Sequence, residues 1–233
     1  MKAQKLFNET FFGFLEKLFL IVSFGEISGF GLTQAQHALS SKYSGLLKNL
    51  LQSPAYAGML GQPTALLARD LPSQLTRKLT DRALEKAVGS VEGACFIYAH
   101  TLLDTALSDY CRAAAMADPK GWRALAAKAA SPDSKAMAAG AAYERRRGPL
   151  IERVDLLTAG CRPPAGWAPA PGIRLDRRRI ERLDRLRERA VREGGKVPRA
   201  EDEMLFMVRT ALYLATLLCL RYGFRIDPAV LLR

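Results

Sequence analysis

The 233-residue chain has few of the residues from which metal and nucleotide sites are usually built. It contains two histidines and four cysteines, whereas a zinc site needs three or four such ligands close together. The sequence has no glycine-rich phosphate loop ending in Lys-Ser or Lys-Thr, no GxSxG nucleophile elbow and no HExxH helix. These absences argue against several large enzyme classes. We expect no metal ion and no cofactor.

The cysteines and the apolar segments indicate a compartment. No two cysteines have CxxC spacing; they lie at Cys95, Cys111, Cys161 and Cys219. They are typical of reduced structural thiols in the cytoplasm. The uncharged apolar runs at 18–25 and 210–220 are well short of the roughly 20 residues that span a membrane. We therefore expect a cytoplasmic protein without integral membrane association.

The sequence predicts an all-α fold, because no useful length of chain alternates apolar and polar residues as a β-strand does. Apolar residues recur at helical spacing over residues 6–24, 33–51, 80–117, 122–130, 134–144, 151–159, 177–193 and 201–222. The segment GEISGFG is expected to break the first helix, and a loop rich in proline and glycine is expected from residue 52 to Pro72. We predict a helical bundle at 80–233, with an N-terminal helical extension at 1–75.

The helices at 80–117 and 201–222 have the longest apolar faces, and we expect them to pack against each other with the arginine-rich helix beside them. Four leucines should be buried in this packing: Leu102, Leu107, Leu212 and Leu217.

The net charge of +12 favours an acidic partner such as RNA, DNA or an anionic membrane. Residues 101–233 carry +9 of this charge, and 21 of their 25 basic residues are arginine. Arginine suits bidentate contacts to phosphate. A GC-rich coding sequence would produce the same bias without any binding role, and composition does not separate these two explanations.

Nine arginines lie between residues 174 and 192. Apolar residues recur at roughly helical spacing among them, so the segment predicts an amphipathic helix, with Asp176 as its cap. Residues four apart can form ion pairs across one turn, as for Arg177–Glu181, Glu181–Arg185 and Glu188–Arg192. The cationic side is either a solvated surface with internal ion pairs or a surface that binds a nucleic-acid backbone.

His100 lies on the long predicted helix, one turn before Asp104. A carboxylate four residues away can orient an imidazole and make it more basic, as acid–base catalysis requires. The alternative is a buried His–Asp pair that satisfies only its own polarity.

Three segments occur in an order that resembles the HEPN superfamily of small α-helical domains. SVEGACFIYAHTLLDTALSDYC looks like the long first helix of that domain, LDRLRERAVREGG like its signature helix, and TALYLATLLCLRYGFRID like its closing helix. The resemblance covers roughly the last 150 residues. Many members are ribonucleases of toxin–antitoxin and phage-defence systems. The resemblance therefore implies a homodimer in which paired motifs cut RNA without metal.

The family motif is an arginine followed, after four to six residues, by a histidine. Arg187 matches the arginine, but Arg192 stands at the histidine position. A guanidinium cannot accept a proton from a ribose 2′-hydroxyl near neutral pH. The resemblance thus implies a degenerate ribonuclease that keeps its affinity for RNA or a nucleotide-bearing partner. The expected phosphate contacts are Arg185, Arg187, Arg189 and Arg192, with His100 and Asp104 as a reserve acid–base pair if the two helices face one cleft.

Two other functions fit the same sequence. One is a non-enzymatic protein–protein interaction module, in which the arginine stripe is soluble surface. The other is peripheral attachment to a membrane through the Phe-rich N-terminal helix and the cationic surface.

Overall fold

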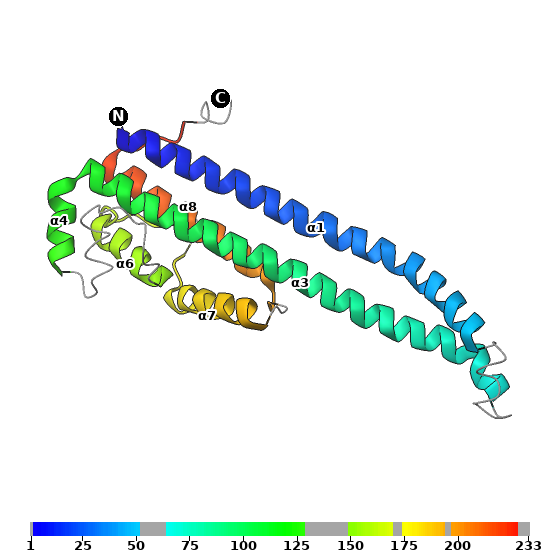
Figure 1. Cartoon of the computed structure of the whole chain (residues 1–233). Helices are drawn as coiled ribbons and strands as arrows, with labels where there is room; N and C mark the ends of the chain where they lie inside the picture. The colour runs from blue at the N-terminus through cyan, green and yellow to red at the C-terminus, as the bar shows by residue number, and fades with distance from the viewer. Residues whose placement is uncertain (1, 52–63, 129–148, 170–173, 194–196, 228–233) are drawn as a thin grey trace.

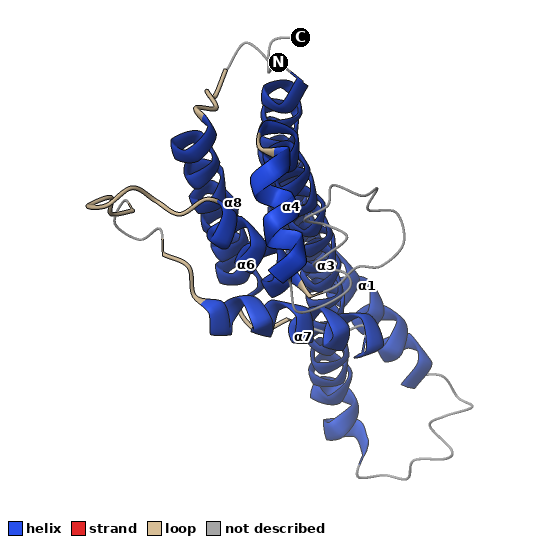
Figure 2. Cartoon of the chain, turned by 90° about the vertical axis from the view of Figure 1, so that its left-hand side faces the viewer, coloured by secondary structure: helices blue, strands red, loops and turns tan. Residues whose placement is uncertain are grey.

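The computed structural model describes residues 2–51, 64–128, 149–169, 174–193 and 197–227. These residues form helices and connecting loops, with no strand among them (Figure 2). The helices are α1 (Lys2–Leu51), α3 (Thr64–Ala117), α4 (Pro119–Lys128), α6 (Leu150–Gly160), α7 (Arg177–Glu193) and α8 (Ala200–Tyr222). The all-α prediction is confirmed. The helix predicted at 134–144 lies outside the described residues.

The two longest helices, α1 and α3, lie side by side along their length (Figure 1). Helices α4, α6, α7 and α8 gather beside one end of this pair, and α8 packs mainly on α3. Arg225, just after α8, lies beside the first turn of α1. Gln4 donates a hydrogen bond to the carbonyl of Arg225 and accepts one from the Arg225 backbone N–H.

The break predicted at GEISGFG is wrong, since α1 continues through it to Leu51. Glycine costs a helix about 1 kcal/mol relative to alanine, and the long contact with α3 outweighs this cost. Gly25 faces Cys95 closely, because a Cβ built at Gly25 would lie 3.6 Å from the Cys95 sulfur. Cys95 also donates a hydrogen bond to the Ile21 carbonyl. Packing between helices, which local propensity does not report, keeps this segment helical.

The predicted loop before residue 80 is also shorter than expected. Helix α3 begins at Thr64 and runs without interruption to Ala117, so Pro72 lies inside it. The domain boundary that the sequence predicts between 75 and 80 therefore falls within a single helix.

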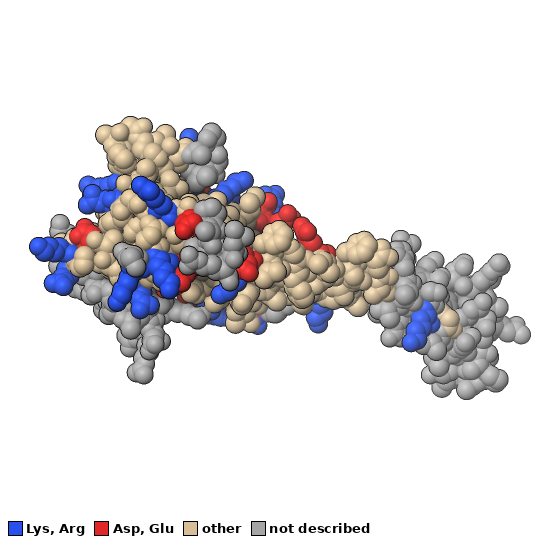
Figure 3. All heavy atoms as spheres, turned by 90° about the horizontal axis from the view of Figure 1, so that it is seen from above, with Lys and Arg blue, Asp and Glu red and all other residues tan. Residues whose placement is uncertain are grey.

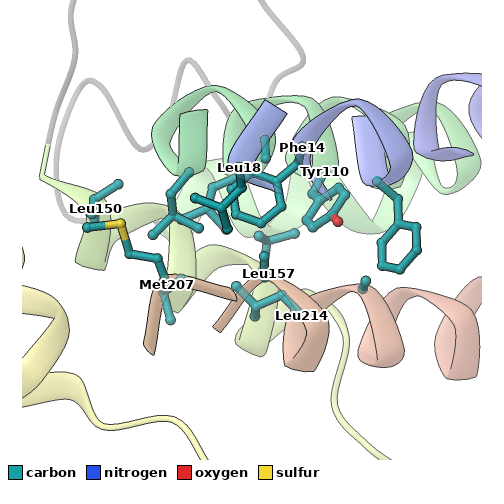
Figure 4. Close-up of a cluster of buried hydrophobic side chains, with 14 of the residues drawn as sticks. Phe14, Leu18, Tyr110, Leu150, Leu157, Met207 and Leu214 are labelled. Carbon is teal, nitrogen blue, oxygen red and sulfur yellow. The ribbon is translucent and has the colours of Figure 1, made fainter. Parts of the chain in front are cut away.

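One hydrophobic core joins α1, α3, α6 and α8 (Figure 4). Its buried side chains include Phe14, Leu18, Tyr110, Leu150, Leu157, Met207 and Leu214. Because Phe7, Phe11 and Phe12 of α1 are buried in the same cluster, the first helix is part of this core.

The predicted burial of the four leucines is confirmed in full for two of them. Leu107 and Leu217 are buried, whereas Leu102 and Leu212 are partly buried and pack against the core from its edge.

Helix α8 is held at both ends and buried in the middle. Three carboxylates stand in its first turn, where the helix dipole favours negative charge, and Gly223 ends it in the left-handed conformation, with φ 68°. By length and composition α8 is the one described helix that could cross a membrane, and 56% of its apolar window is buried inside the protein.

Two buried thiols in the core are expected to make the protein less stable at alkaline pH. Burial raises the pKa of Cys111 to about 12 and that of Cys161 to about 11, from the ordinary value of 9.0. Above pH 9 the unfolded chain releases these protons while the folded chain keeps them, so stability is complete below pH 9 and falls as the pH rises. We expect each thiol to lower the free energy of unfolding by roughly 2 kcal/mol at about pH 10.5.

Urea unfolding under reducing conditions, at about pH 8 and about pH 10.5, measures this loss. The double variant Cys111→Ala/Cys161→Ala should lose much less stability between the two pH values than the parent. An equal loss in both proteins would show that other groups cause it.

Candidate functional site

Helix α7 is anchored through its cap and its apolar side. The carboxylate of Asp176 accepts a hydrogen bond from the Arg179 backbone N–H at 3.0 Å, which confirms the predicted cap. Ile180, Leu183 and Ala190 are buried beneath the helix. In Figure 2, α7 lies across the direction of α6 and α8. One side of the helix is thus fixed to the bundle, and the opposite side faces solvent.

Some of the arginines hold α7 in place. Glu203 of α8 is almost fully buried and pairs with both Arg179 and Arg182, with 2.9 Å between its Oε2 and the Nε of Arg179. The guanidinium of Arg179 also lies over the Phe206 ring, 4.5 Å from its centroid. Arg177 pairs with Asp155 of α6 at 2.7 Å rather than with Glu181 as predicted. These three arginines have a structural role.

The outer face of α7, which we define as Arg178, Arg185, Arg189 and Arg192, is exposed. Spacings of seven, four and three residues place these side chains on one side of a helix. Arg192 and Glu188 form the predicted pair at 3.7 Å, but both are well exposed and such pairs add little stability. Within the described part of the chain, Arg178, Arg185 and Arg189 make no ion pair.

Arg187 faces the other way, into a pocket between α3 and α7. The pocket holds about 170 Å³ and is lined by His100, Thr101, Asp104, Pro149, Asp184, Arg187 and Glu188. The two predicted groups, His100 and Arg187, therefore line the same cleft. Arg185, Arg189 and Arg192 do not line it. The arginine that stands at the motif histidine position faces solvent.

The carboxylate bonded to His100 is Asp184 of α7, with 2.9 Å between Nε2 and Oδ1. The other oxygen of Asp184 accepts a hydrogen bond from the Leu150 backbone N–H at 3.0 Å. The prediction that Asp104 is the partner of His100 is therefore corrected. That prediction rested on the spacing of one helical turn between His100 and Asp104. The actual partner lies on another helix, 84 residues further along the chain.

Asp104 has a structural partner instead. It forms an ion pair with Arg153 of α6 at 2.8 Å, and both side chains are buried, Arg153 completely. Arg153 also donates to the Ser108 hydroxyl and the Pro149 carbonyl. This cluster joins α3 to α6 beneath the pocket.

The ring nitrogens of His100 are not open to the pocket. Nε2 of His100 is bonded to Asp184, and Nδ1 is buried without a hydrogen-bond partner in the described residues. A base must offer a lone pair within reach of the substrate proton. The Nε of Arg187 is likewise buried without a partner there, so Arg187 still has donor capacity. The pocket is thus a polar space of mixed charge beside a cationic face.

Sequence reasoning missed Asp184, Arg153 and Glu203, although one signal for Glu203 was present. Glu203 lies three and four residues before Phe206 and Met207, so it shares one side of the helix with these apolar residues. A carboxylate on such a face is rarely buried without a partner, and this indicates an arginine on a neighbouring element.

The comparisons with known proteins do not assign a family. No family model matches the chain, and no curated protein or solved structure is significantly similar to it. Among the described residues, no group of three or more His, Cys, Asp and Glu side chains could hold a metal ion. The fold and site therefore define an all-α protein with a cationic helix face next to a polar pocket.

Proposed function

We propose that the chain binds RNA through the outer face of α7 and does not cleave it. The observation that supports this proposal is the division of the arginines on α7. Three of them pair with carboxylates that fix the helix, whereas four face solvent on one side. A merely solvated salt-bridge surface would pair most of its charges internally, and three of these four have no ion pair in the described structure.

The geometry of the face suits a phosphate backbone. Arg178 and Arg192 are fourteen residues apart, which is about 21 Å along a helix. This length can follow several successive phosphates of one strand. Arginine forms short, charge-assisted hydrogen bonds with phosphate, and Arg187 at the pocket can add a further donor from the inner edge of the helix.

The resemblance of residues 80–228 to the HEPN superfamily supports RNA as the polyanion, and a toxin–antitoxin or defence system as the setting. The absence of cleavage follows from the site chemistry. Arg192 cannot act as a base. In His100, the reserve base, Nε2 is hydrogen-bonded to Asp184 and Nδ1 is buried. The proposed protein is a cytoplasmic RNA-binding member that lacks the nuclease step.

The test is the binding of a labelled single-stranded RNA, followed by fluorescence anisotropy over a series of salt concentrations. Affinity should fall steeply as salt rises, since each neutralised phosphate releases counterions. In the variant Arg185→Gln/Arg189→Gln/Arg192→Gln, the log–log salt slope should decrease by about 2, and affinity at low salt should fall by at least roughly tenfold.

The control removes the same charge elsewhere, with Arg112→Gln/Arg123→Gln/Arg162→Gln, all exposed and outside α7. It should bind nearly as the parent does. If both triple variants lose affinity equally, net charge rather than the outer face binds RNA. The bound RNA should be recovered intact in the presence of a metal chelator; cleavage that disappears in His100→Gln would contradict the absence of a base.

A further inference from the structure

Five large apolar side chains on α1 face solvent. We name them the α1 apolar face; they are Phe19, Leu20, Phe24, Ile27 and Phe30, and each is between 59% and 71% exposed. Leu20, Phe24 and Ile27 follow at spacings of four and three, which is the pattern of a helix that packs against another helix. Monomeric soluble proteins rarely expose so many large apolar groups together.

The apolar surface continues onto α3. Lys17, Leu20, Ile21 and Phe24 of α1 line a groove of about 340 Å³ together with Ala94, Cys95 and Tyr98 of α3, and Tyr98 is itself 53% exposed. In the view of Figure 3, Lys and Arg gather at the broad end of the molecule, while Asp and Glu follow one edge of the α1–α3 pair beyond it. This surface is therefore separate in character from the cationic face of α7.

We propose that two copies of the chain dimerise by packing their α1 apolar faces together. The two α1 helices run antiparallel across a two-fold axis near Phe24. Because Phe19 and Phe30 lie five and six residues on either side of Phe24, this register places Phe19 of one copy against Phe30 of the other. Because α3 lies alongside α1 in each copy, four helices take part in the contact. The groove beside Tyr98 of each copy accepts side chains of the other.

The exposed area is close to what a stable dimer needs. Large apolar side chains offer about 150–200 Å² each, so the α1 apolar face presents on the order of 500–600 Å² per copy. A standard interface buries about 800 Å² on each partner, including a polar rim, and the groove beside Tyr98 adds to the apolar part. Closed two-fold dimers are the commonest soluble assemblies.

Charge favours a second copy over a lipid surface. Helices that lie on membranes carry Lys and Arg on their polar side, but residues 18–36 contain no basic residue and a single charge, Glu26. Lys17, at the edge of the groove, is the one cation beside the α1 apolar face on α1, and an anionic bilayer would find no other along the stretch, whereas an identical apolar face needs none.

The experiment is sedimentation velocity of the full chain over a range of concentrations, together with flotation on vesicles of neutral and of anionic lipid. The parent should sediment as a dimer and should not float with either vesicle. In Leu20→Ser/Phe24→Ser and in Phe24→Glu/Ile27→Glu the dimer dissociation constant should rise by at least about 100-fold, since two central apolar anchors are lost. Both variants change exposed positions, and far-ultraviolet circular dichroism would verify that they remain helical.

The control is Val191→Glu, which places a charge on an equally exposed apolar residue of α7 (58% exposed) and should leave the dimer intact. A parent that stays monomeric at high concentration would overturn the proposal. A dimer that survives both α1 variants would overturn it as well, because another surface would then hold the copies together. Flotation of a monomeric parent that is lost in the α1 variants would assign the face to a membrane instead.

Discussion

Asp104→Ala should lower the free energy of unfolding by about 3–5 kcal/mol, because breaking a buried ion pair at one partner removes a carboxylate that compensates the buried charge of the other. Arg153, the other partner, has no exposed side-chain surface, and its guanidinium lies 2.8 Å from Asp104. The hydrogen bonds from Arg153 to Ser108 and Pro149 remain in the variant, but they are made to neutral groups. Urea unfolding at neutral pH measures the change.

Two further variants make this result specific. Asp155→Ala removes a carboxylate from an exposed pair with Arg177 and should cost less than about 1 kcal/mol. The double variant Asp104→Leu/Arg153→Met removes both charges and should be clearly more stable than Asp104→Ala. If Asp104→Ala costs no more than Asp155→Ala, the buried pair is not the structural link between α3 and α6, and Asp104 again becomes a candidate for the site chemistry.

Leu107→Ala and Leu217→Ala should each cost about 2–5 kcal/mol, since each truncation removes buried methyl groups and leaves a cavity in a packed core. Leu107 and Leu217 are at most 1% exposed, and they lie on α3 and α8, which pack against each other. Thermal and urea unfolding would measure both losses.

Leu205→Ala provides the matched control, because Leu205 lies on α8 and is 47% exposed. It should change stability by no more than about 0.5 kcal/mol. The partly buried Leu102 and Leu212 should give intermediate losses. Equal losses at Leu205 and Leu217 would contradict the burial pattern of α8.

The helical class and most of the helix positions followed from the sequence. The expected starts and ends of α7 and α8, and the expected end of α6, agree with the structure within about two residues, because apolar periodicity and the Asp176 cap act locally. The errors lie where distant packing outweighs local propensity. Gly25 stays helical because α1 packs against α3. The sequence of residues 25–31 alone gives no sign of that contact.

The site shows the same division at the level of single side chains. That α7 is amphipathic and cationic, and that His100 lies on a long helix, could be read from the sequence, since both are properties of one helix. Which arginines are exposed, which carboxylate meets His100 and which charge balances Arg153 depended on residues brought together from different helices. Sequence determined the inventory of charges and the periodicity that buries one side of each helix. Tertiary structure alone decided the partners, because an ion pair forms between residues that are close in space, whatever their separation along the chain.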